Sequence, residues 1–126
     1  MPFTTDFRES GIIWNFSGTV TFRDLLDTNA TAWGHENWPK FRFQIIDFSG
    51  IEGFLVDPSD GLAMARIDTV AAKSEPNMSM RVAIVATRPD VLEAAQSYLD
   101  WLEVPSWETR ICSTAEEAMN WACTHQ

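Results

Sequence analysis

The chain has 126 residues, of which 45% are apolar, 21% charged and 12% aromatic. This composition is ordinary for a globular protein, which excludes a disordered chain or a fibrous repeat, and the length predicts a single domain over residues 1–126. Nine Lys and Arg stand against eighteen Asp and Glu, so the formal net charge is −9. Because such a surface repels phosphate backbones and anionic headgroups, we expect no nucleic acid and no membrane surface as partner.

The sequence carries no recognisable membrane span or export signal. The longest strongly apolar run, residues 82–86, is far shorter than the roughly 20 residues of a membrane helix. The first residues lack the basic start and apolar stretch of a signal peptide. Cys112 and Cys123 are therefore expected to be reduced thiols in a cytoplasmic protein, and their spacing fits no zinc motif. We predict no metal and no cofactor.

Two strands and a helix are predicted first. Apolar and polar residues alternate over 3–7 and again over 12–16, with a Ser-Gly turn between them, which predicts an antiparallel hairpin. A second Ser-Gly pair, at 17–18, is expected to end the second strand. Thr21 and Asp24 have the spacing of a capping box and predict a helix that ends near Gly34.

The middle of the chain predicts a buried strand and a well-capped helix. Adjacent apolar residues within 41–48 indicate a strand that is buried on both faces and ends near Asp47. No element is assigned to 49–56. Asp57 then serves as a helix N-cap, with Pro58 at the first helical position and Asp60 at the third. The apolar residues that follow carry this helix to about residue 74.

The last third of the chain predicts two more strand–helix pairs. Residues 81–87 form the clearest buried strand, and 107–112 form the last one. The helix between them has its core stripe at Val91, Ala95, Tyr98 and Leu102. A short final helix is expected to begin at a capping box made by Ser113 and Glu116, with Ala115, Ala118, Met119 and Ala122 toward the core.

The predicted order of elements is β-β-α-β-α-β-α-β-α. Helices between successive strands imply right-handed crossovers and a mainly parallel sheet. We therefore predict an α/β fold with a single mixed, mainly parallel five-stranded sheet and four helices, whose functional groups should gather beyond the carboxyl ends of the strands.

Four polar residues near those strand ends are candidates for phosphorylation or partner binding. Ser59, at the second position of its helix, would present its hydroxyl to solvent, where a phosphate meets free backbone N–H groups. Asp57 and Asp60 flank it and would oppose that phosphate by like charge. Asp47, after a central strand, is either a solvated carboxylate or a binding group. Ser59, His35 and Asp47 can be combined into a catalytic set, but their spacing does not favour it, so we expect no enzyme.

Trp101 and Trp121 are placed unusually among the six Trp and eight Phe of the chain. Each lies about 100° from the core stripe of its helix, at the spacing of 3.6 residues per turn. Such side chains either pack on a neighbouring helix or form a subunit contact. The second alternative predicts a homodimer.

Several segments together resemble a known family. The segment from Ile45 to Ile51 contains Asp47-Phe48-Ser49 and resembles STAS-class anti-sigma-factor antagonists, in which a strand ends in Asp-x-Ser. The helix opening Asp57-Pro58-Ser59-Asp60-Gly61-Leu62 is similar to the Asp-Ser-Ser-Gly-Leu that follows in those proteins. The strand 81–85 and the ending Ser113-Thr114-Ala115-Glu116-Glu117-Ala118 up to Trp121 are more specifically similar to the bacterial SpoIIAA-like family. The resemblance covers roughly residues 10–122.

The resemblance implies a STAS-like fold and a regulatory, non-enzymatic domain that binds a protein partner and is switched at Ser59. It also implies an alternative, a carrier of a small apolar ligand or lipid, because the family is similar in fold to lipid-carrying domains. The chain departs from the antagonists at two points. Asp60 stands between Ser59 and Gly61, and the segment from Gly50 to Asp57 is longer.

Overall fold

The computed structural model of the protein describes residues 3–75 and 78–123, and its five strands form one sheet in the order β1-β2-β3-β4-β5. β1 is antiparallel to β2, and β2 to β5 run parallel. The predicted α/β class, the mixed five-stranded sheet and the four helices are confirmed. The strands are β1 (Phe3–Phe7), β2 (Gly11–Thr21), β3 (Phe43–Leu55), β4 (Met80–Val85) and β5 (Trp107–Cys112). The helices are α1 (Phe22–Trp33), α2 (Pro58–Ala72), α3 (Pro89–Trp101) and α4 (Ala115–Cys123).

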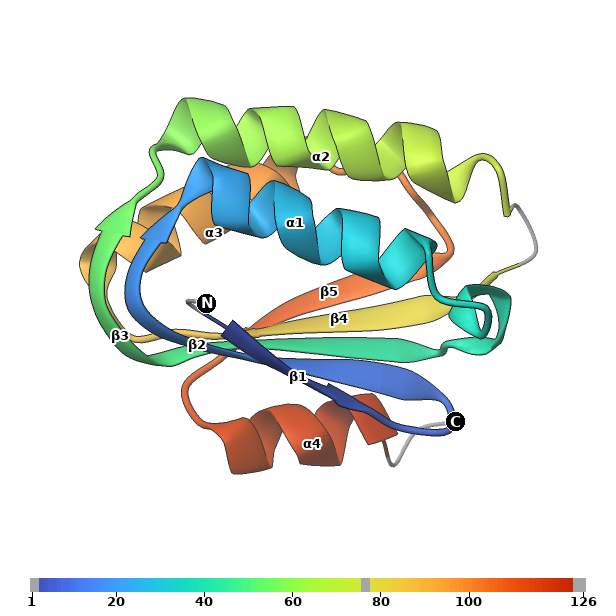
Figure 1. The fold of residues 1–126 in the computed structure, drawn as a ribbon. Helices are drawn as coiled ribbons and strands as arrows, with labels where there is room; N and C mark the ends of the chain where they lie inside the picture. Colours follow the sequence, from blue (N-terminus) through green and yellow to red (C-terminus); the bar gives the residue numbers. More distant parts are fainter. Residues whose placement is uncertain (1–2, 76–77, 124–126) are drawn as a thin grey trace.

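The helices lie on both faces of the sheet (Figure 1). α1, α2 and α3 connect successive parallel strands that advance in one direction, so right-handed crossovers place all three on the same face. α4 follows the edge strand β5 and covers the other face. The predicted order lacks one element, a short 3-10 helix, η1 (Trp38–Lys40), between α1 and β3.

Two strands are longer than the sequence predicts. β2 continues past residues 17–18 to Thr21, and β3 runs through the unassigned segment to Leu55. Irregular register near Ser17 and Gly18 lets both strands bend while they stay paired. Gly18 has a φ of 66°, a left-handed conformation that glycine adopts at little cost. Gly18, expected at a strand end, and Gly50, in the unassigned segment, therefore lie inside strands that curve toward α1 and α2 (Figure 1).

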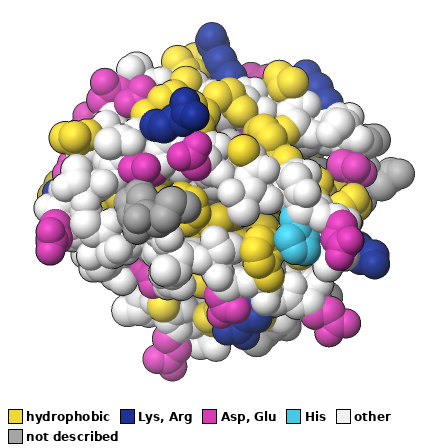
Figure 2. All heavy atoms as spheres, viewed as in Figure 1, with side chains coloured by type: hydrophobic (Ala, Val, Ile, Leu, Met, Phe, Trp, Pro, Cys, Tyr) yellow, Lys and Arg dark blue, Asp and Glu magenta, His cyan; other side chains and the backbone are white. Residues whose placement is uncertain are grey.

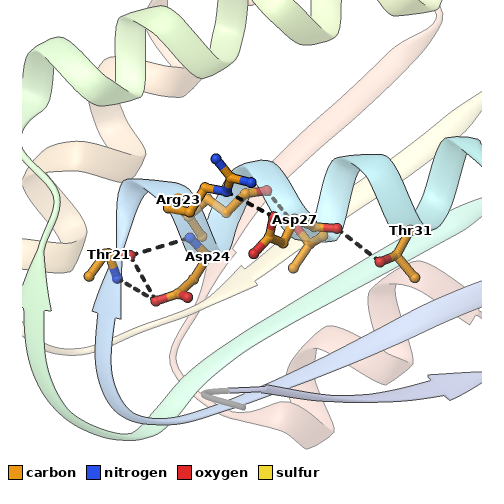
Figure 3. Close-up of polar contacts among 7 residues, drawn as sticks. Thr21, Arg23, Asp24, Asp27 and Thr31 are labelled. Atoms are coloured by element: carbon orange, nitrogen blue, oxygen red, sulfur yellow. Dashed lines mark hydrogen bonds and ion pairs between the residues drawn. The ribbon is translucent and has the colours of Figure 1, made fainter.

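Helix caps follow the sequence closely. Thr21 accepts a hydrogen bond from the backbone N–H of Asp24, whose carboxylate accepts from the backbone N–H of Thr21 (Figure 3). Asp57 and Asp60 make the same reciprocal box at α2. At α4 the predicted cap is shifted by one residue, because the hydroxyl of Thr114, not that of Ser113, accepts from the N–H of Glu117.

The buried side chains form two layers, one on each face of the sheet. The larger layer lies under α1, α2 and α3, and the smaller lies between α4 and strands β3 to β5. Ala118 and Ala122 are buried in the smaller layer, whereas Ala115, expected there, is exposed. In the larger layer, α2 packs chiefly on α3, and α1 on β2. The approach of α2 and α3 is close at Gly61, where a Cβ atom would collide with the carbonyl oxygen of Ala94.

Figure 2 shows hydrophobic side chains exposed along the part of the surface where α2 lies, with acidic side chains distributed around them. Val70 on α2 retains 69% of its accessible surface, and Leu55 at the end of β3 retains 70%. Among residues 3–75 and 78–123, none of the helices has both the length and the apolar character needed to cross a bilayer.

Candidate functional site

A cavity of about 80 Å³ lies in the larger layer of the core, between the sheet and helices α1, α2 and α3. We call it the central cavity. Its lining comes from α1, α2, α3, β3, β4 and the segment before α2. Its apolar part includes Leu25, Ile46, Phe48, Met64, Val82 and Ile84, and its polar side chains are Thr28, Asn29, Gln44, Asp68 and Tyr98.

A buried carboxylate is the central polar feature of this cavity. Asp68, in the middle of α2, retains only 7% of its accessible surface. Its Oδ2 accepts a hydrogen bond of 2.5 Å from the hydroxyl of Tyr98 on α3, and its Oδ1 accepts one of 2.9 Å from the amide nitrogen of Asn29 on α1. The three residues therefore join the three helices at the cavity.

Burial changes the acid–base chemistry of this network. It raises the pKa of Asp68 to about 6, because removing the carboxylate from water disfavours its charged form, while the hydrogen bonds from Tyr98 and Asn29 act in the opposite direction. Burial also raises the pKa of the Tyr98 hydroxyl, and the neighbouring charge of Asp68 adds to this rise. At neutral pH the Tyr98 hydroxyl is thus protonated and donates to an ionised carboxylate.

The helical periodicity explains why Asp68 points inward. The buried positions of α2 are Gly61, Met64, Ala65, Asp68 and Ala72, which recur at intervals of three and four residues and so form one face of the helix. Tyr98 belongs to the predicted core stripe of α3, and Asn29 lies one turn before the end of α1. Asp68 and Asn29 are functional candidates that the sequence analysis missed. A carboxylate on an otherwise apolar helix face is the signal that could have identified Asp68.

The candidates at the start of α2 lie together on the surface. Ser59 and Asp57 are exposed, and the Ser59 hydroxyl donates a 2.5 Å hydrogen bond to Oδ1 of Asp57. That hydrogen bond holds the pKa of Asp57 below its ordinary value, and a hydrogen bond from the backbone N–H of Asp60 adds a smaller effect in the same direction. The outward orientation expected for Ser59 is present. The two flanking carboxylates lie in the same turn, as expected from their spacing.

Asp47 and His35 do not join Ser59. Asp47 is an internal residue of β3, not its last, and its carboxylate accepts a hydrogen bond from the N–H of Ser49. It shares the strand face of Phe43 and Ile45, which pack toward α4, whereas Ser59 belongs to the opposite layer.

His35 follows the C-terminal end of α1, and that helix end lies at the opposite end of the parallel strands from the start of α2 (Figure 1). Its ring stacks on Phe7 at 4.3 Å, and its Nδ1 accepts a hydrogen bond from the backbone N–H of Asn37. The catalytic combination of Ser59, His35 and Asp47 is therefore not assembled.

The two tryptophans expected at a subunit contact lie on opposite faces of the sheet. Trp101, at the end of α3, retains 49% of its accessible surface. Trp121, on α4, is half-buried, and the guanidinium groups of Arg81 and Arg110 lie 5.3 Å and 5.9 Å from its ring centroid. Arg81 also donates to its backbone carbonyl. Trp121 thus has partners within the chain, and the two side chains do not form one patch.

The remaining candidates offer little chemistry. Cys112 is buried and Cys123 half-buried, both are free thiols, and burial raises the pKa of each. Within the described ranges, no group of three or more His, Cys, Asp or Glu side chains is arranged to hold a metal ion. His125 lies outside the described residues.

Comparison of the chain with protein-family models, with curated proteins and with solved structures gives no match. The chemistry of the central cavity and of the first turn of α2 is therefore what bears on function. The cavity combines a buried ionisable group with an apolar lining, whereas the turn presents one exposed hydroxyl between two carboxylates.

Proposed function

We propose that the protein is a non-enzymatic binding domain whose ligand, a small and mainly apolar molecule, occupies the central cavity. The observation that carries this proposal is the cavity itself, which is lined mostly by aliphatic and aromatic side chains and holds one polar network. Ligand sites generally have this construction, since the apolar lining supplies binding energy and a few polar groups orient the ligand.

Two further observations support binding without catalysis. Close packing leaves few voids inside protein cores, and the central cavity of about 80 Å³, with a carboxylate in its wall, is one of them. The residues that would make a nucleophile, a base and an acid, Ser59, His35 and Asp47, are distributed over both ends and both faces of the sheet.

Mass spectrometry of organic extracts tests this proposal. Protein purified under native conditions from its own host should release one small organic compound in an amount comparable to that of the protein. The variant Ala95→Leu, which places three more carbon atoms at the cavity wall, should release much less. Equal release from both proteins, or no compound from either protein even after incubation with a library of small apolar molecules, would contradict the proposal.

A second candidate function is a regulatory, protein-binding domain of the STAS-like, SpoIIAA-like class that is switched at Ser59. The exposed hydroxyl in the first turn of α2 favours it, because a phosphoryl group there would be accessible to a kinase and to a partner. The order of strands and helices and the capped opening of α2 support the STAS-like part of the proposal. A cytoplasmic, bacterial setting belongs to the same proposal, and the free thiols of Cys112 and Cys123 are consistent with it.

Mapping of phosphopeptides in protein isolated from the host tests the switch. We expect one phosphorylated site, Ser59, and its loss in Ser59→Ala. Because Ser59 is exposed, this variant should keep its free energy of unfolding within about 0.5 kcal/mol of the wild type, so the loss cannot be ascribed to unfolding. Ser49→Ala, at another exposed serine, is the control. Phosphate on a different serine, or none under conditions that activate host kinases, would argue against Ser59.

A further inference from the structure

The Asp68 carboxylate has more capacity to accept hydrogen bonds than the chain uses. An ionised carboxylate offers about four lone-pair positions. Tyr98 and Asn29 occupy one position on each oxygen, at 2.5 Å and 2.9 Å. Asp68 is one of the residues that line the central cavity, so it borders the space that a ligand would occupy.

No positive charge of the cavity lining balances this carboxylate. Among the described lining residues Asp68 is the one charged side chain, and Tyr98 is the one other group that can lose a proton. The described ion pairs of the protein are all made by arginine side chains elsewhere, and none includes Asp68. An ionised carboxylate that is this deeply buried is costly unless a positive partner or further donors compensate it.

We propose that the ligand of the central cavity is a small apolar amine, bound as an ammonium ion that donates hydrogen bonds to Asp68. This inference rests on the proposed binding function and specifies the chemistry of its ligand. The carboxylate lacks a positive partner and further hydrogen-bond donors, and an ammonium group supplies both. The alkyl part of the ligand would lie against the apolar lining, at Ile46, Met64 and Ile84.

Neighbouring acceptors complete the match to an ammonium group, which has three N–H donors. Thr28 and Asn29 lie next to each other on α1, both line the cavity, and each carries a side-chain oxygen. The Thr28 hydroxyl donates its proton to the carbonyl of Leu25, so its oxygen is left as an acceptor. The lining of the cavity therefore contains hydrogen-bond acceptors on both α1 and α2.

The cavity volume limits the alkyl part. A cavity of about 150 Å³ holds benzene in a well-studied engineered protein. The central cavity, at about 80 Å³, is smaller and suits an amine with a short alkyl chain. A carboxylic acid of the same size would face repulsion from Asp68. An alcohol offers one donor and leaves the charge uncompensated.

Titration with n-propylamine and with 1-propanol, which have nearly the same size and shape, isolates the contribution of the charge. Isothermal titration calorimetry of the wild-type chain at pH 7.5 and physiological salt should give binding of the amine that is at least about tenfold tighter than that of the alcohol. Asp68→Asn should remove this preference. Glu93→Gln, which removes an exposed carboxylate from α3, should leave it unchanged and so controls for attraction of the amine to the acidic surface.

A pH series adds a second readout that needs no variant. The amine stays protonated from pH 5 to 7.5, whereas Asp68, with a pKa near 6, becomes neutral at the acid end, so amine binding should weaken on acidification and alcohol binding should not. Tyr98, the other titratable group that faces the cavity, stays neutral over this range.

The outcomes separate this inference from the proposed function. Alcohol binding equal to or tighter than amine binding would overturn the amine inference and keep the cavity as a ligand site. Amine binding that persists unchanged in Asp68→Asn would also overturn it, since the contact would then lie elsewhere. Failure of both probes to bind would count against the binding function as well. If Asp68→Asn does not fold, nuclear Overhauser contacts between n-propylamine and the methyl groups of Met64 and Ile84 in the wild type replace it, and their absence would contradict the inference.

Discussion

Replacing Asp68 with asparagine is expected to remove a loss of stability that the wild-type chain suffers as pH rises. The pKa of Asp68 is raised from 3.8 to about 6 in the folded protein, so the folded state holds this proton more tightly than the unfolded state does. The protonated Asp68 carboxyl therefore stabilises the folded state, and this stabilisation is fully present below pH 3.8 and is lost as pH rises through about 6. Between pH 4.5 and 7 it amounts to about 2 kcal/mol.

Urea unfolding of both proteins at pH 4.5 and pH 7, without ligand, measures this effect. The free energy of unfolding of Asp68→Asn relative to the wild type should rise by about 2 kcal/mol between the two pH values. Any constant cost of the altered hydrogen bonds cancels in this comparison. The carboxylates of Asp57 and Asp90, whose pKa values are lowered by hydrogen bonds, are present in both proteins, so their contributions cancel as well. A relative stability that does not change with pH would contradict the assignment of a buried, ionisable Asp68.

Enlarging two alanines is expected to have opposite effects in the two layers of the core. Ala95 on α3 borders the central cavity, so Ala95→Leu should fill it and raise the free energy of unfolding by about 1–2 kcal/mol through added apolar burial. Ala118 on α4 is completely buried in the smaller layer. Because its side chain is packed on every side between α4 and the sheet, Ala118→Leu should lower the free energy of unfolding by about 1–3 kcal/mol.

The same two variants, Ala95→Leu and Ala118→Leu, also test the location of the ligand. Ala95→Leu should abolish binding of n-propylamine and of any compound extracted from the host protein, while Ala118→Leu, if folded, should keep both. Calorimetry and denaturant unfolding give the two readouts on the same preparations. Destabilisation by both substitutions to the same extent would mean that the space next to Ala95 does not accept a larger side chain.

Local sequence signals predicted most of the fold, because those signals act within a few residues. The predicted N-caps Thr21 and Asp57 fix where α1 and α2 begin, and both are confirmed. The alternating apolar pattern of the first hairpin and the buried run at 81–87 place β1 and β4, and the start of β2, with small errors. At α4, two hydroxyls in succession each fit a cap, and the choice between Ser113 and Thr114 depends on backbone geometry that the pattern does not contain.

The lengths of β2 and β3 could not be predicted in the same way. Because glycine is typical of turns, the sequence predicts a strand end at Gly18 and no strand in the segment that contains Gly50. Each strand nevertheless continues because the other provides a partner, and pairing between strands that are about 30 residues apart is a tertiary property. The displaced position of Asp47, inside β3 and not at its end, follows from this extension.

The polar network of the central cavity depends on tertiary packing in a similar way. The sequence places Tyr98 in the core stripe of α3, but it does not reveal that Asp68 and Asn29 meet its hydroxyl. The three residues come from three helices and are up to 69 positions apart in the chain. The position of Asp68 on the apolar face of α2 is visible in the sequence, and it marks the residue as one that needs a partner.

A crystal structure of the protein grown at pH 7.5 and soaked in n-propylamine tests the central cavity as a ligand site most directly. We predict one amine molecule between the sheet and helices α1 to α3, with its nitrogen within hydrogen-bonding distance of a carboxylate oxygen of Asp68 and its alkyl chain against Ile46 and Ile84. Amine bound only at surface carboxylates, with none in the cavity at saturating concentration, would contradict the account.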